Sequence, residues 1–237
     1  MTFLRNAFDG TDSGAGPPSI GRVRRFTAIG VVVAAPLALA VAGLVHPHGL
    51  TGSTAAHWEE LHIWLLPVFP LVGLGFVVPL WGRPGRDLAG VASVVAWLAA
   101  FGYACFYTGL DAVAGIAAGS AARHAPPGAD LGRVAAPLFD TGDRLGRIGV
   151  YAFLVAVVAA SVALLLRHGI RVLPGSVVLL IAGYSFVDSH IFWPRGVVTM
   201  LGFAVGFGWL AGIAGAPTRA GGPSPVPGHR SQTGPSR

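Results

Sequence analysis

Long apolar runs alternate along the chain with short polar stretches that contain most of its arginines. Six such runs can be marked, at residues 26–45, 61–81, 88–118, 147–166, 172–193 and 197–213. A helix of about 20 residues, rising about 1.5 Å per residue, spans the roughly 30 Å hydrocarbon core of a bilayer. The pattern predicts an all-α, polytopic transmembrane helix bundle of about six spans. Pro36 is expected to kink the first span, whereas the second run contains Pro67, Pro70 and Pro79, which membrane helices tolerate.

The polar segments around these runs predict how the rest of the chain is organised. Residues 1–25 and 215–237 are rich in Gly, Pro and Ser and are expected to be disordered, which leaves 26–214 as the transmembrane domain. The polar stretch before residue 147 is expected to lie on the membrane surface, with Asp143 capping the next helix. A cleavage-like Ala38-Leu39-Ala40 lies within the first run, but the run continues past it, which favours a retained helix.

The arginines predict an orientation. With a cytoplasmic N-terminus, eleven arginines lie on the inner side and five on the outer side, so both termini are expected in the cytoplasm of a multi-pass cell-membrane protein. Four tryptophans near the ends of the runs are typical of an interfacial aromatic belt: Trp58, Trp64, Trp81 and Trp193.

Composition supports a lipid environment and argues against nucleic acid as a partner. The chain is 53% hydrophobic and 11% charged, against about 25% charged residues in soluble domains. Its net charge of +6 comes from scattered arginines, so nucleic acid is not an expected partner. The bilayer is the expected partner, and Gly-x-x-x-Gly pairs such as Gly202 and Gly206 would serve helix packing or a homo-oligomer equally well.

Histidines and acids are concentrated on the expected outer side, which holds six of the eight histidines and seven of the ten acids. A first patch, His46-Pro47-His48 and then residues 57–62, joins the first two runs. If 57–62 is helical, Glu59 and His62 share one face, an arrangement used for metal ligands in helical bundles.

Two further patches lie near the same expected depth. Tyr103, Tyr107 and Asp111 are spaced four apart in the third run, and a carboxylate near hydrocarbon normally faces a protein interior or a water-filled cavity. Asp188 and His190 close the fifth run before Trp193-Pro194, where the helix is expected to break.

Because these patches share one depth, a metal site is the leading hypothesis. His46, His48, His62, Asp188 and His190 are the candidate ligands, and Asp111 and Glu59 are candidates for a catalytic base or for groups that support the ligands. Imidazole and carboxylate suit a divalent metal ion such as zinc, and the single Cys105 argues against a thiolate-rich site. Such a centre would support membrane-embedded hydrolase chemistry.

Three alternatives remain open. A haem protein would use His62 and His190 as axial ligands. A transporter of a small solute or ion would use Asp111 and Asp188 along its substrate path. An assembly or scaffold protein would have no catalysis of its own.

Overall fold

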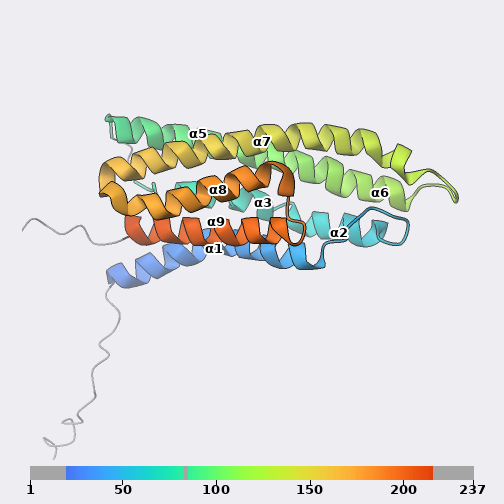
Figure 1. Ribbon diagram of the computed structural model, residues 1–237, viewed down its shortest axis with the longest axis horizontal. Helices are drawn as coiled ribbons and strands as arrows, with labels where there is room; N and C mark the ends of the chain where they lie inside the picture. The colour runs from blue at the N-terminus through green and yellow to red at the C-terminus, as the bar shows by residue number, and fades with distance from the viewer. Residues whose placement is uncertain (1–19, 83–84, 216–237) are drawn as a thin grey trace, which may run out of the picture.

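The computed structural model describes residues 20–82 and 85–215, and within those ranges every regular element is a helix. The helices lie side by side in one elongated bundle (Figure 1). Their bounds are α1 Ile20–Val45, α2 Ala55–Leu65, α3 Val68–Leu71, α4 Leu74–Val77, α5 Leu88–Leu110, the π-helix η1 Asp111–Ala117, α6 Ala118–Arg123, α7 Leu131–His168, the 3-10 turn η2 Gly169–Val172, α8 Leu173–Ser189 and α9 Arg195–Ala214.

Five helical stretches in the described part of the chain are long and apolar enough to cross a membrane: Gly21–Val45, Ala55–Val77, Leu88–Arg123, Leu131–Ser189 and Arg195–Ala214. Large apolar side chains such as Phe26, Leu98 and Phe101 are exposed on the outside of the bundle, as lipid contact requires. The prediction of an all-α fold is therefore confirmed, and these stretches have the length and composition of membrane spans. The expected fourth and fifth spans fall within one stretch, in which the chain turns back at η2 and α8 lies beside α7 (Figure 1).

Helix boundaries depart from the hydropathy pattern at the first two runs. Helix α1 begins at Ile20, inside the segment expected to be disordered. Of the other residues expected in the lead and the tail, 1–19 and 216–237 lie outside the described ranges. The second run is broken into α2, α3 and α4 near Pro67 and Pro70, because proline has no N–H to continue the helical hydrogen-bond series.

The polar stretch before residue 147, expected on the membrane surface, is largely helical. Helix α7 begins at Leu131, and the Asp130 carboxylate caps it by accepting a hydrogen bond from the backbone N–H of Arg133. The prediction that Asp143 caps this helix is wrong, because Asp143 lies inside α7, about three turns after its first residue.

Close packing of α5 against α7 depends on small residues. A Cβ on Gly149 would lie 3.1 Å from the backbone nitrogen of Tyr107, and one on Gly146 would overlap the side chain of Leu110. These glycines bring α7 close to the segment of α5 that contains Tyr107.

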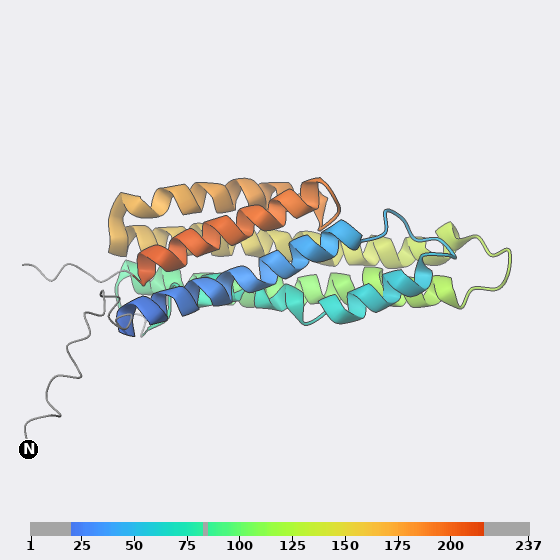
Figure 2. The same cartoon turned by 90° about the horizontal axis from the view of Figure 1, so that it is seen from below.

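The bundle has a step at one end. Helix α1 begins and α9 ends at the opposite end, whereas α2, α6 and the first half of α7 extend past the ends of α1 and α8 (Figure 2). His46 follows α1 and His190 follows α8, so both histidines lie at this step, against helices that continue beyond it.

Candidate metal centre

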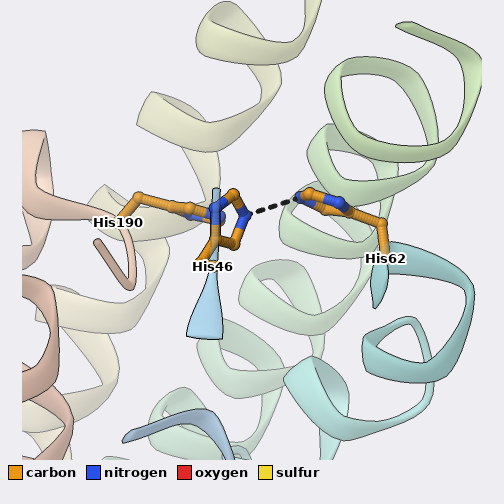
Figure 3. A group of neighbouring side chains, drawn as sticks. All are labelled: His46, His62 and His190. Carbon is orange, nitrogen blue, oxygen red and sulfur yellow. Dashed lines mark hydrogen bonds between the residues drawn. The ribbon is translucent and has the colours of Figure 1, made fainter. Parts of the chain in front are cut away.

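Three histidines from distant parts of the chain meet at the step. His46 lies just after α1, His62 lies in the last turn of α2, and His190 lies just after α8 with a positive φ of 45°. One ring nitrogen from each histidine lies within 4.8 Å of the other two, and Figure 3 shows His46 between His62 and His190. His46 and His62 are 3% and 2% exposed and His190 is half-buried, so most of the cluster lies inside the bundle.

The hydrogen bonds of the rings fix where two of the protons lie. Nδ1 of His62 lies 2.7 Å from the backbone oxygen of Trp58, and Nδ1 of His46 lies 2.8 Å from that of Pro47. A carbonyl oxygen only accepts, so both Nδ1 atoms carry the proton and donate it. In the neutral rings both Nε2 atoms are then left with an unshared electron pair.

These two Nε2 atoms face each other at 3.4 Å (Figure 3). With the Nδ1 atoms protonated, neither Nε2 has a hydrogen to donate to the other, so a shared cation is needed to make the approach favourable. Two imidazoles bound at about 2.0–2.1 Å to one tetrahedral zinc ion have their nitrogens about 3.3 Å apart. The observed spacing is therefore that of two ligands of one metal ion.

The third imidazole is held by a side chain. The hydroxyl of Tyr107 lies 2.6 Å from Nδ1 of His190. A hydroxyl accepts as well as donates, so Nδ1–H of His190 can donate to it and leave Nε2 free for a metal. Orientation of a ligating histidine through its second nitrogen is the usual arrangement in metal centres.

Aromatic rings enclose the cluster, and burial favours the neutral form of His46 and His190. The ring of Phe69 is 5.6 Å from that of His190, and the ring of Phe192 is 4.5 Å from that of His46. Burial, together with the neighbouring histidines, lowers the pKa of His46 from 6.5 to about 4. Burial, followed by the charges of His62 and His46, lowers the pKa of His190 well below its ordinary value. Neutral imidazole is the form that binds metal.

Asp111 adds a carboxylate to the same place. Its side chain is fully buried, and its Oδ1 lies 4.0 Å from Nε2 of His62. Among the described residues, neither carboxylate oxygen has a hydrogen-bond donor. A buried carboxylate without hydrogen bonds is costly unless it is paired with a positive charge. Asp111 therefore indicates a cation beside the histidines, independently of the rings themselves.

The π-helix η1, which begins with Asp111, packs against α2. The indole nitrogen of Trp58 donates to the backbone oxygen of Ala114 at 3.2 Å. A Cβ on Gly115 would overlap the imidazole of His62, so only glycine leaves room for that ring. Single π-helical turns are often found at functional sites.

A cavity of about 420 Å³ borders the cluster. His62, Tyr107 and His190 are part of its wall, and α7 and α8 supply most of the remainder, including Asp143, Arg147 and Phe186. Small-molecule sites are commonly about 300–1,000 Å³, with mostly apolar walls and a few placed polar groups. A ligand in this cavity would reach two of the three histidines.

The other candidate residues lie outside the histidine cluster. His48 is exposed, Glu59 forms an ion pair with Arg123 at 3.3 Å, and Asp188 forms one with Arg195 at 2.7 Å. Asp188 also lines the cavity, but its carboxylate is paired with the guanidinium group of Arg195.

Two interpretations of the sequence fare differently in this geometry. Trp58, expected at the membrane interface, is 5% exposed and stacks on His62, with ring centroids 5.1 Å apart. For the haem alternative, His46 lies between His62 and His190, where a porphyrin plane would have to pass (Figure 3). The supporting role of Tyr107 is signalled in the sequence only by its spacing from Asp111, and that of Trp58 only by its spacing from His62.

Comparison with family models, with curated proteins and with solved structures found no match to this chain.

Proposed function

We propose that this chain is a multi-pass membrane metalloprotein in which His46, His62 and His190 bind one divalent metal ion through Nε2, with zinc as the best match. The observation that carries the proposal is the pair of Nε2 atoms at 3.4 Å whose Nδ1 atoms both face carbonyl oxygens. Three imidazoles that leave one position open are typical of catalytic zinc.

The chemistry that suits such a centre is hydrolysis in the adjacent cavity. The metal would lower the pKa of a bound water to near 7 and polarise a carbonyl or phosphoryl oxygen of the substrate. Asp111, whose Oδ1 lies 4.0 Å from Nε2 of His62, would be the base that takes the proton of that water, and the leaving group would take up a proton when its bond breaks. Glu59, in its ion pair with Arg123, is the weaker candidate for this base.

Metal analysis of the detergent-purified protein, with a visible absorption scan, tests this function. We expect about one equivalent of metal in the wild type and in His48→Ala, which removes an exposed histidine outside the cluster, and little metal in His62→Ala or His190→Ala. A folded wild-type protein without metal would refute the proposal and favour a transporter, for which Asp111→Asn should abolish flux. A Soret band would favour haem.

The proposal includes a topology of six crossings in the cell membrane with both termini in the cytoplasm. It is supported by the reversal at η2, where Gly169 has a φ of 67°, and by the excess of arginines on the side of the termini. Single cysteines introduced into Cys105→Ser protein provide the test. An impermeant maleimide should label Thr51→Cys in intact cells and leave Arg86→Cys unlabelled; the reverse pattern would invert the topology.

A further inference from the structure

The cavity beside the histidines follows one stripe of α7. Phe139, Asp143, Arg147 and Val150 all line it, and their spacing of three or four residues places them on one face. At about 1.5 Å per residue the stripe is about 16 Å long. It runs from Phe139, in the first half of α7, to Val150, which is buried near the middle of that helix.

The inner end of the cavity is apolar. Val150 and Phe186 are each 2% exposed, and Val187 lies beside them on the wall. Such a surface binds an alkyl chain through the hydrophobic effect. Trp193, three residues after His190, is 54% exposed, as tryptophans at the headgroup level of a bilayer are. The cavity therefore lies where a membrane amphiphile would place its head.

Two opposite charges lie in a fixed order beyond the apolar end. Arg147 is nearer to Val150, and Asp143 lies one turn farther out. In the described part of the chain, the ion pairs are formed by other residues, so Arg147 and Asp143 pair neither with each other nor with a third group. The cavity wall thus offers a cation next to the apolar end and an anion beyond it.

Aromatic rings surround the outer charge. Phe139 lies one turn from Asp143 on the stripe, and its ring meets that of Trp58 edge-on at 6.0 Å. Phe192, 6.2 Å from Trp58, is part of the same wall. Aromatic faces beside a carboxylate recognise quaternary ammonium groups.

We propose that the cavity binds a single-chain membrane amphiphile with a zwitterionic phosphocholine-type head. The phosphate lies at Arg147, the quaternary ammonium lies at Asp143, Phe139 and Trp58, and the alkyl chain points toward Val150 and Phe186. This inference rests on the proposed function in one respect: such a lipid is the substrate class of the metal centre only if that centre exists.

Binding of hexylphosphocholine, a short and monomeric probe, tests the inference by calorimetry on the full chain in a maltoside detergent. We expect it to bind at least tenfold more tightly than hexyl phosphate or hexyltrimethylammonium, each of which satisfies one charge. Arg147→Gln and Phe139→Leu should each weaken binding at least tenfold. Arg144→Gln, an exposed arginine of the same helix outside the cavity wall, should bind as the wild type does.

A bulky side chain in the cavity gives a second test, because Val187→Trp should abolish binding by filling the space. Equal binding of the three probes, or wild-type affinity in both Arg147→Gln and Val187→Trp, would overturn the inference. Metal content is measured on the same samples. Metal without phosphocholine binding would refute the ligand and leave the metal centre standing, whereas phosphocholine binding without metal would support the ligand and refute the metal centre.

Discussion

Removal of the Tyr107 hydroxyl should weaken metal binding without removing a ligand. The hydroxyl lies 2.6 Å from Nδ1 of His190, and in the metal-bound form that nitrogen must carry the proton. Tyr107→Phe leaves this partly buried N–H without its acceptor, and a lost partner of this kind costs about 1–3 kcal/mol. The metal-free variant can avoid this cost by moving the proton to Nε2, whereas the metal-bound form cannot. At about 1.4 kcal/mol per tenfold, we expect metal affinity to fall roughly 5- to 150-fold.

Competition with a chromophoric zinc chelator in detergent measures this change, and Tyr103→Phe is the matched control. Tyr103 lies one turn earlier on α5, is fully buried, and donates its own hydroxyl hydrogen bond to the backbone oxygen of Phe69 at 3.2 Å. The control therefore loses a buried hydrogen bond that does not involve a metal ligand. Unchanged affinity in Tyr107→Phe, or an equal loss in both variants, would refute the reasoning.

Three further perturbations should affect the same centre. Gly115→Ala places a methyl group where the His62 ring lies and should reduce bound metal below half an equivalent, whereas Gly102→Ala, with 3.5 Å of clearance, should retain it in the same metal analysis. Asp111→Asn removes a buried carboxylate without hydrogen bonds, so the melting temperature of the metal-free protein should rise, and added zinc should raise it by less than in the wild type. A lower melting temperature both without and with zinc would count against a role for the Asp111 charge. Free zinc at about 100 times its Kd should stabilise the wild type by about 2.7 kcal/mol in a denaturant titration and leave His62→Ala unchanged; equal gains in both would indicate binding elsewhere.

Hydropathy predicted the membrane helices because lipid requires long apolar runs, and it predicted helix ends less well because a helix does not stop where lipid stops. Helix α7 begins at Leu131 in a polar stretch, since capping by Asp130 and packing against α6 stabilise it outside an apolar run. Hydropathy predicts one continuous span for the second run, whereas the structure has short helices there, with breaks near Pro67 and Pro70.

For the site, the sequence indicated residue types and an approximate depth, but it did not indicate which histidines meet. His46 and His48 are equivalent in sequence, yet one is buried against His62 and the other is exposed. The difference comes from the turn after α1, which sets the direction of each side chain only through tertiary contacts. Asp188 was a reasonable ligand by position, and its ion pair with Arg195 depends on how α9 packs against α8.

X-ray absorption spectroscopy at the metal edge of the purified protein tests the central claim most directly. A histidine centre should show about three imidazole nitrogens at about 2.0 Å, with the outer-ring scattering of imidazole, and an oxygen ligand at a similar distance. The imidazole signal should fall in His190→Ala. A metal surrounded by oxygen alone, or a spectrum unchanged in that variant, would show that the three histidines do not form the centre.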